Sequence, residues 1–410
     1  MTAAETTQPL VFPDGFRWGA ATAAHQIEGN NINNDWWPRE HAPGTSIAEP
    51  SGDACDSYHR YGEDITLLAE LGLDTYRFSI EWSRIEPEEG FVSRAEIAHY
   101  RRMVEACQAA GLTPMVSLMH FTVPRWFADD GGWRSAKAVD RFRRFTELAL
   151  PVVADGVPWV CTINEPNIAA MIAGGEDPAN LVAYGLPAPD LAVADTLLAC
   201  HRAAREVLAE HTSVASGWTV ATQAFQPEPG CEDVAREYGH QRDDWYLEAV
   251  RGDDWVGVQA YTRTIIGPDG PRQVPDGVET TLTGWEYYPP ALEIGVRSAW
   301  ELTGGVPVFV TENGIATADD TRRIDYTAGA LAGLHAAIAD GVDVWGYLHW
   351  SALDNYEWAS GFRPTFGLIG VDRQTFERTP KPSAAWLGEV ARTNTLRIPH
   401  HLGIEMGENA

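Results

Sequence analysis

Short apolar segments alternate with longer amphipathic segments along nearly the whole chain. The short segments are rich in β-branched and aromatic residues, which favours β-strands, and the longer ones are rich in Ala, Leu and Arg, which favours helices packed on one face. The eight expected strands span 16–22, 74–82, 113–120, 159–165, 213–221, 255–261, 306–312 and 343–350. The expected helices include 60–71, 94–110, 137–153, 191–210, 289–302 and 325–340.

This alternation of strand and helix predicts a parallel sheet, and eight such units close most naturally into a (β/α)8 TIM barrel. The alternative is an open doubly wound sheet, which we disfavour because no glycine-rich GxGxxG turn follows the first expected strand. No low-complexity linker or close repeat divides the sequence. We therefore expect residues 1–410 to form a single catalytic (β/α)8 barrel domain of the α/β class.

Composition and charge limit the classes of partner. Of the 410 residues, 44% are hydrophobic, which suffices for a large core. The formal net charge is −28, from 58 acidic and 30 basic residues, and the acidic residues are spread along the chain. Because binding to phosphates requires clustered Lys and Arg, this balance argues against nucleic acid and anionic membranes as partners. We expect an uncharged partner.

The cysteines and the N-terminus bear on location. The five cysteines are widely spaced and show no CxxC pair, which indicates neither a disulfide framework nor a zinc site. The first residues lack a basic segment followed by an apolar one, and no run approaches the roughly 18 apolar residues of a membrane span. We expect a cytoplasmic protein. In the polar stretch 30–61, Asp35, Glu40 and Asp53 show no metal-ligand spacing, so we expect an ordered loop over the barrel rim and no metal.

Polar residues lie at or near the carboxyl ends of the apolar strands, which is where the active site of a (β/α)8 barrel is located. A charged side chain in such a place faces a pocket instead of the core. These residues are Gln26, Glu28, Arg77, His120, Asn164, Glu165, Tyr261, Glu312 and Trp350.

Two of them, Glu165 in "TINEP" and Glu312 in "VTENG", form the central candidate pair, on the fourth and seventh strands. Two carboxyl groups facing each other can hydrolyse a glycosidic bond, because one donates a proton to the leaving oxygen and the other attacks or stabilises the sugar carbon. Each motif also has a structural interpretation, as an Asn-Gly turn and as a helix start with Pro in its first turn. Their joint occurrence on alternate strands favours the catalytic interpretation.

Five segments in the same order resemble glycoside hydrolase family 1, the retaining β-glycosidases that include β-glucosidases. The resemblance covers most of the chain and implies a TIM barrel. Its segments are "FRWGAATAAHQIEG" (16–29), "YRFSIEWSRIEP" (76–87), "TINEP", "VTENG" and "HWSALDNYEWASGF" (349–362).

The resemblance implies roles for individual residues. Glu312 would be the nucleophile and Glu165 the general acid and base, with Arg77 and Tyr261 supporting Glu312. No metal or organic cofactor would be needed. Trp285 would provide an aromatic platform for the leaving group. The sugar transferred to the enzyme, the glycone, would be bound by Gln26, His120, Asn164, Trp350, Glu357 and Trp358.

The sequence departs from the family pattern at several positions. Phe121 stands where relatives usually carry Trp, so one indole donor to the substrate is absent from this substrate-binding position. Asn167 stands where many relatives carry Trp, and Gln259 where Asn is common. The chain is also short for the family after Asn167, which predicts a wider leaving-group side. Glu357 and Trp358 replace the Ser, Lys and Tyr cluster of relatives that cleave 6-phosphosugars, so a phosphorylated glycone is not expected.

The leading interpretation is a retaining exo-β-glycosidase, most of all a β-glucosidase, acting on a small-molecule β-glycoside or an oligosaccharide. One alternative is a transglycosidase that acts on a small-molecule glycoside, which no local feature separates from a hydrolase. Another is a carbohydrate-binding protein without catalysis, which is disfavoured because both carboxylates are present. The sequence leaves open the glycone, the aglycone and the oligomeric state.

Overall fold

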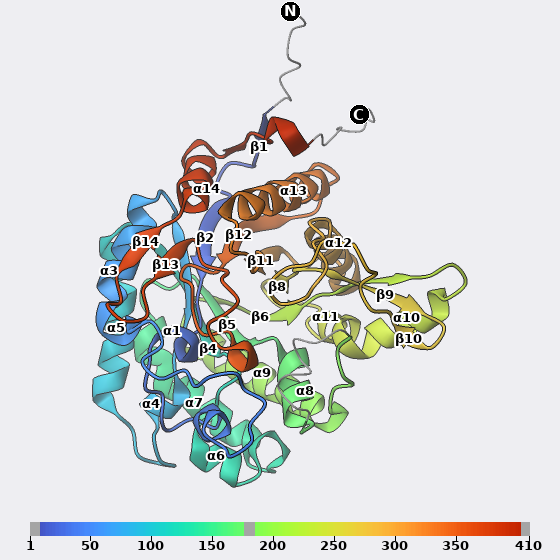
Figure 1. The fold of residues 1–410 in the computed structure, drawn as a ribbon. Helices are drawn as coiled ribbons and strands as arrows, with labels where there is room; N and C mark the ends of the chain where they lie inside the picture. Colours follow the sequence, from blue (N-terminus) through green and yellow to red (C-terminus); the bar gives the residue numbers. More distant parts are fainter. Residues whose placement is uncertain (1–8, 176–184, 403–410) are drawn as a thin grey trace, which may run out of the picture.

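The computed structural model describes residues 9–175 and 185–402, and its centre is a closed barrel of eight parallel strands (Figure 1). The strands follow one another around the barrel in chain order, and β12 closes it by pairing with β2. The predicted (β/α)8 barrel and all eight predicted strands are confirmed. The barrel strands are β2 (Arg17–Ala21), β3 (Thr75–Ser79), β4 (Thr113–Met119), β5 (Trp159–Asn164), β6 (Ala215–Ala221), β8 (Val256–Gln259), β11 (Val308–Asn313) and β12 (Val344–Trp350).

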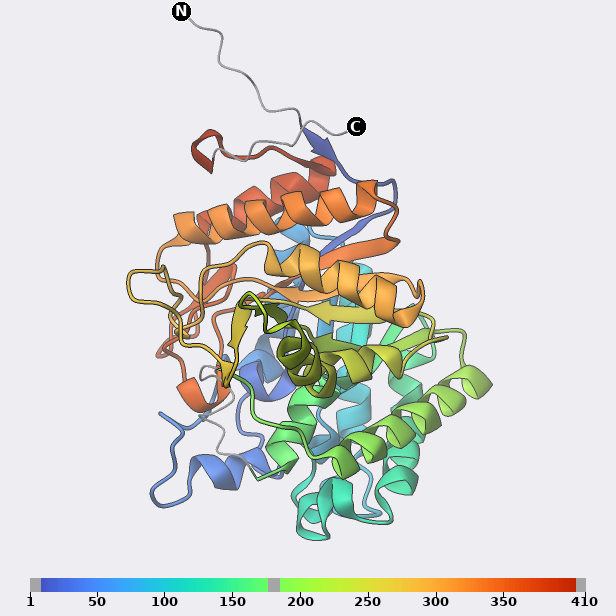
Figure 2. The same cartoon turned by 90° about the vertical axis from the view of Figure 1, so that its right-hand side faces the viewer.

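Helices follow each strand and surround the barrel, as α9, α12 and α13 do in the view of Figure 2. The expected helices are present, and three of them begin after a residue whose side chain accepts a hydrogen bond from a backbone amide of the first turn, namely Ser93, Asp190 and Asp319. Asp319 accepts a hydrogen bond from the amide of Thr321, so α13 begins five residues before the expected start at Asp325. The outer helices are α3 (Ser57–Glu70), α5 (Arg94–Ala109), α7 (Ala138–Val153), α9 (Leu191–His211), α11 (Trp245–Glu248), α12 (Ala291–Thr303), α13 (Asp320–Ala339) and α14 (Pro382–Thr393).

Shorter elements decorate the loops. Strands β7, β9 and β10 form a small separate sheet that projects at the right of Figure 1, and β1 pairs with β15 beside α14. The stretch 30–61 contains the helix α2 in addition to loop. The shorter elements are β1 (Leu10–Val11), α1 (Ala24–Ile27), α2 (Trp36–Glu40), α4 (Trp82–Ile85), α6 (Arg125–Asp129), η1 (Gly132–Arg134), α8 (Pro166–Ala173), β7 (Ala224–Pro227), α10 (Glu232–Gly239), η3 (His240–Asp244), β9 (Arg263–Gly267), β10 (Gly270–Pro271), η4 (Trp358–Ser360), β13 (Ile369–Val371), β14 (Arg378–Pro380), β15 (Thr395–Leu396) and η5 (His400–Leu402).

The barrel strands are buried on both faces, as expected for parallel strands covered by helices. Inside the barrel, Met115, Cys161, Phe309 and Leu348 from four strands pack into one apolar cluster. Arg77 lies next to this cluster, with a guanidinium nitrogen 4.0 Å from the sulfur of Cys161. The barrel interior therefore changes from hydrocarbon to a polar layer toward the carboxyl ends of the strands. In the two described ranges, none of the helices combines the length and hydrophobicity needed to cross a membrane.

Candidate active site

A cavity opens at the carboxyl ends of the barrel strands, and ten of the twelve predicted site residues line it. They are Gln26, His120, Phe121, Glu165, Tyr261, Trp285, Glu312, Trp350, Glu357 and Trp358. The remaining two, Arg77 and Asn164, are fully buried and contact the lining residues from behind. The barrel thus brings together residues from β3, β5 and β11 and from the segments that follow β2, β4, β8 and β12.

The carboxylate of Glu312, at the end of β11, accepts hydrogen bonds from three side chains. Its Oε1 accepts from Nη1 of Arg77 and from Nε2 of Gln259, each at 2.6 Å, and its Oε2 accepts from the hydroxyl of Tyr261 at 2.6 Å. Burial raises the pKa of Glu312 above its ordinary value, and the charge of Arg77 and the hydrogen bonds from Tyr261 and Arg77 offset part of this rise. These donors fix the orientation of the carboxyl group and favour its ionised form.

Glu165 lies at the turn from β5 into α8, where it adopts a left-handed backbone conformation with φ of 44°. Its side chain is 8% exposed and lines the same cavity as Glu312. Burial raises the pKa of Glu165 well above its ordinary value, and the negative charge of Glu312 raises it further. Arg77 lowers this pKa only partly. Of the two carboxyl groups, Glu165 is therefore the one whose protonated form is more strongly favoured.

Gln259 also belongs to the site, although in the sequence it stood out only as a departure from the family pattern. It lies directly opposite Glu312 in the pairing of β8 with β11. Its amide nitrogen donates to Glu312 and also to Oδ1 of Asn164, at 2.9 Å. Gln259 and Tyr261 are two positions apart, so the alternation of side chains along a strand could have identified both as inward-facing.

We expect Gln259→Leu to lower kcat/KM about 10- to 100-fold, the effect of losing a hydrogen bond to a charged group. Because the lost donor favours the ionised carboxylate, the pKa of Glu312 should rise, and the acidic limb of the pH profile of kcat/KM should move to higher pH. The measurement is the pH dependence of p-nitrophenyl glycoside hydrolysis. Gln374→Leu, at an exposed turn, is the matched control. An unchanged acidic limb would show that Gln259 has only a packing role.

Polar groups and aromatic rings share one side of the cavity. The Nε2 of His120 lies 3.2 Å from the amide nitrogen of Asn164, which donates to it, so the proton of the neutral ring is on Nδ1. Burial and the charge of Arg77 lower the pKa of His120 well below its ordinary value. Within the described ranges, this Nδ1 and the Oε1 of Gln26 are buried without a hydrogen-bond partner. Both atoms are suited to sugar hydroxyls.

Aromatic rings stand beside these polar atoms. The ring of His120 stacks near Trp350 and Trp358, with centroids 5.8 and 6.3 Å away, and Phe121 meets Trp358 edge-on at 5.2 Å. Trp36 of α2 also lines the cavity and packs against Trp358. The stretch 30–61 therefore contributes to the site itself, beyond the expected loop over the rim. Rings beside hydrogen-bonding groups match a sugar, which has an apolar face and a rim of hydroxyls.

Glu357 is a third carboxyl group in the cavity. Burial raises its pKa to about 8, the hydrogen bond from the indole of Trp350 opposes this, and the charges of Glu312 and Asp354 add to it. Glu357 therefore keeps its proton at neutral pH, so it can both donate to and accept from hydroxyl groups.

We expect Glu357→Gln to stabilise the fold more at pH 8 than at pH 5, by about 1–3 kcal/mol. The pKa of Glu357 is raised in the folded state, so the wild type loses stability as the pH rises from the ordinary pKa of 4.5 toward 8. The amide does not titrate and avoids this loss. Urea unfolding at both pH values measures the difference, with the exposed Glu377→Gln as control. An equal effect at both pH values would contradict the raised pKa.

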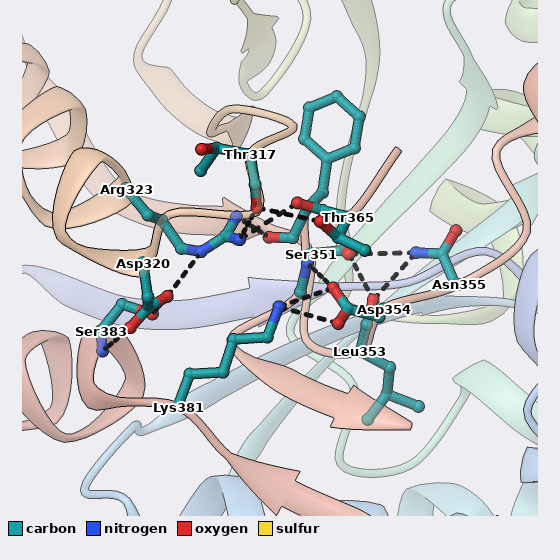
Figure 3. A network of polar contacts seen from close by, with 12 residues as sticks. Thr317, Asp320, Arg323, Ser351, Leu353, Asp354, Asn355, Thr365, Lys381 and Ser383 are labelled. Carbon is teal, nitrogen blue, oxygen red and sulfur yellow. Dashed lines mark hydrogen bonds and ion pairs between the residues drawn. The ribbon is translucent and has the colours of Figure 1, made fainter. Parts of the chain in front are cut away.

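A polar network holds Ser351, Asp354 and Asn355 in the segment after β12, which leads to Glu357 and Trp358 (Figure 3). The amide nitrogen of Gln26 donates to Oδ1 of Asn355 at 3.0 Å, and the amide nitrogen of Asn355 donates to Ser351 at 3.0 Å. Lys381 donates to Asp354 at 2.8 Å. Arg323, at the start of α13, donates to the backbone carbonyls of Ile315, Thr317, Thr365 and Phe366.

The acidic residues of the stretch 30–61 have partners within the protein. Among the residues that the structure describes, no group of three or more His, Cys, Asp or Glu side chains is arranged to hold a metal ion. The partners are Arg39 for Asp35 at 3.4 Å, His25 for Glu40 at 2.7 Å, and Asn30 for Asp53 at 2.6 Å.

Comparisons with known proteins agree on one family. The model of glycosyl hydrolase family 1 matches residues 8–252 and 258–396. Beta-glucosidase A of Thermotoga maritima is 31% identical, over 94% of this chain and 98% of its own. Thermostable beta-glucosidase B of Thermobispora bispora is 34% identical, over 96% of this chain and 93% of its own.

Solved structures give the same result. Beta-glycosidase BGL167 superposes with a TM-score of 0.85 at 44% identity and covers 97% of this chain and 100% of its own. The family 1 β-glucosidase of Thermotoga maritima superposes with a TM-score of 0.88 at 27% identity, with 95% and 100% covered. One structure of the Thermotoga maritima β-glucosidase is a complex with glucoimidazole.

Proposed function

Because the chain belongs to glycosyl hydrolase family 1, we propose that its cavity hydrolyses β-glucosides with retention of configuration at the sugar carbon. Its substrate is a glycoside, as the family implies. The observation that carries the proposal is the difference between two carboxyl groups in one cavity. Glu312 is held by Arg77, Gln259 and Tyr261, whereas burial and the charge of Glu312 keep a proton on Glu165.

In the first step, the Glu312 carboxylate attacks the anomeric carbon while Glu165 donates its proton to the leaving oxygen. The bond from the anomeric carbon to the leaving oxygen breaks, and an ester between the sugar and Glu312 forms. In the second step, Glu165, now ionised, takes a proton from a water molecule while the oxygen of that water attacks the anomeric carbon, and the bond from the anomeric carbon to Glu312 breaks. The sugar is released with its original configuration, and both carboxyl groups return to their starting states.

The polar end of the cavity would bind the glycone. Gln26, His120 and Glu357 present a free acceptor, a free donor and a protonated carboxyl group, and Trp350 and Trp358 supply the apolar surface. Asn164 would act through His120, because its amide group is already bonded to that ring. Glucose is the glycone we propose, because the relatives are named β-glucosidases.

The proposal also covers the domain organisation, the cofactor requirement, the partners and the location of the protein. We take residues 1–410 as one catalytic domain that works without a cofactor, on neutral sugars instead of nucleic acid or membranes, as the net charge of −28 suggests. All five cysteines are buried free thiols, which supports a cytoplasmic location.

A panel of p-nitrophenyl β-glycosides tests the proposal, namely the glucoside, galactoside, fucoside, mannoside and glucuronide, with Glu312→Gln as the blank. The glucoside should release p-nitrophenol, and the release should vanish in the variant. Stronger release from another sugar would replace glucose in the proposal. Folded wild-type protein that cleaves none of them would contradict it.

A further inference from the structure

We propose that the leaving-group side of this cavity accepts an extended apolar aglycone, an alkyl or aryl group, in preference to a second sugar. The inference rests on the proposed function, because it concerns the alcohol that Glu165 would protonate. It follows from the side chains that surround Glu165 and from a second cavity beyond them.

The leaving-group side is identified by Glu165 itself, since the acid must reach the oxygen of the departing alcohol. Helix α8 begins at the next residue. Ile168 and Ile172 are three and seven positions after Glu165, so all three lie on one face of the helix. Both isoleucines line the cavity together with Glu165. The departing alcohol therefore meets two branched hydrocarbon side chains along α8.

The flanks of this wall combine apolar and polar side chains. Strand β5, which ends just before Glu165, pairs with β4 on one side and with β6 on the other. His120 and Phe121 line the cavity after β4, and Ala221 and Gln223 line it at and just after the end of β6. Leu186 also lines the cavity. Phe121, Ala221 and Leu186 thus extend the hydrocarbon surface of Ile168 and Ile172, and the polar side chains lie beside it.

Asn167 is the polar side chain of α8 closest to Glu165, and it is turned away from the cavity. It is fully buried, and its amide nitrogen donates to the backbone carbonyls of Ala221 and Arg242 at 2.9 and 2.8 Å. It therefore ties α8 to β6 and η3 and has no donor left for a substrate. A second sugar would lose water from the hydroxyls that face α8 and regain no hydrogen bonds from the side chains of Asn167, Ile168 and Ile172, which disfavours it.

A second cavity continues the apolar surface. Phe121 and Ile172 line both cavities, so the second lies directly beyond the leaving-group wall. Its charged residues are paired within the protein, Arg39 with Asp35 and Arg134 with Asp190. The small or apolar side chains that line it include Val123, Ala128, Trp133, Ala169 and Ala173. An aglycone longer than one ring can extend past Ile172 onto this surface.

The test is a series of alkyl β-glucosides from methyl to octyl, compared with cellobiose. The leaving groups are alcohols of similar acidity, so differences in kcat/KM report contacts between the protein and the alkyl chain. Each fully buried methylene is worth about a fourfold increase, and we expect octyl β-glucoside to exceed methyl β-glucoside at least about tenfold. We also expect it to exceed cellobiose.

Substitutions in α8 test whether its isoleucines cause the dependence of kcat/KM on alkyl chain length. Ile172→Asn and Ile168→Asn should each lower the ratio of octyl to methyl β-glucoside in kcat/KM at least about fivefold, by the same transfer scale. Ile172→Leu should keep the ratio, because it keeps the hydrocarbon. The control is Ile32→Asn, the same change at a residue that is 51% exposed and lies outside both cavities, and it should leave the ratio at the wild-type value.

The outcomes distinguish a failure of the apolar-aglycone inference from a failure of the proposed glucosidase activity. A flat alkyl series, or a higher kcat/KM for cellobiose than for octyl β-glucoside, would overturn the apolar-aglycone inference and leave the proposed glucosidase activity intact. A wild-type ratio in both asparagine variants would overturn it as well. Folded wild-type protein that cleaves none of these glucosides would overturn the proposed activity and the inference together.

Discussion

Replacing Glu312 with alanine should lower kcat/KM for p-nitrophenyl β-glucoside by about 10⁴- to 10⁶-fold, the scale reached when a catalytic nucleophile is removed. Without this carboxylate no ester to the sugar can form. The three hydrogen bonds that hold Glu312 show why no neighbour can replace it: Arg77, Gln259 and Tyr261 all donate toward its oxygens and do not themselves attack.

Azide should restore turnover of Glu312→Ala with an identifiable product. The anion enters the space that the carboxylate leaves and displaces the aglycone in one step, so the product is the α-glucosyl azide, which NMR distinguishes from its β isomer. A β product would reverse the roles of Glu312 and Glu165. The exposed Glu389→Ala is the matched control and should keep wild-type activity.

Glu312→Gln is a second variant in case Glu312→Ala does not fold. Removing the Glu312 side chain leaves the buried charge of Arg77 without its carboxylate partner, which destabilises a fold strongly. Glutamine keeps the volume and an amide oxygen that accepts hydrogen bonds. This variant should fold, as circular dichroism would show, and remain inactive. A folded Glu312→Gln enzyme with substantial activity would contradict the assignment of Glu312 as nucleophile.

The barrel was predictable because its signal is local. Buried parallel strands are short apolar runs, and each of the eight runs became a barrel strand. The meeting of Arg77 and Glu312, 2.6 Å apart, was expected only through the resemblance to a family, since no spacing along the chain relates β3 to β11. The ends of helices were less predictable, as the cap at Asp319 shows, because one hydrogen bond decides them.

Other parts of the site depend on side-chain direction, which a sequence shows less directly. The sequence showed only that Asn167 replaces a tryptophan of many relatives, and the structure shows that its amide nitrogen donates to the backbone of Ala221 and Arg242. The wall of the leaving-group side is made by Ile168 and Ile172 instead. Their helical spacing from Glu165 was a usable signal. Trp36 offered no such signal, because its place in the cavity depends on the packing of the stretch 30–61 against Trp358.

Replacing Glu165 with alanine should have an effect that depends on the leaving group. Alkyl β-glucosides need a proton on the departing oxygen, and their kcat/KM should fall about 10²- to 10⁴-fold. The dinitrophenolate of 2,4-dinitrophenyl β-glucoside leaves without being protonated, so the first step should remain fast for this substrate. The ester to Glu312 should then accumulate, because Glu165 is also the base that activates water in the second step. Mass spectrometry of the intact protein would detect this ester.

Azide distinguishes this variant from Glu312→Ala. In Glu165→Ala the ester to Glu312 forms first, and azide then attacks it from the opposite face, so the product is the β-glucosyl azide. An α product, or an equal loss of kcat/KM for alkyl and dinitrophenyl glucosides, would show that Glu165 is not the proton donor. The exposed Glu377→Ala serves as control and should behave as the wild type.

The pH profile of Glu165→Ala carries a further consequence. In the wild type, the alkaline limb of kcat/KM should reflect loss of the proton from Glu165, whose pKa burial and the charge of Glu312 raise. This limb should disappear in Glu165→Ala with 2,4-dinitrophenyl β-glucoside, while the acidic limb, set by Glu312, should remain. Glu357 has a pKa of about 8 and titrates in the same region. An alkaline limb that survives in Glu165→Ala but vanishes in the double variant with Glu357→Gln would therefore belong to Glu357, and would mean that its proton is needed to bind the sugar.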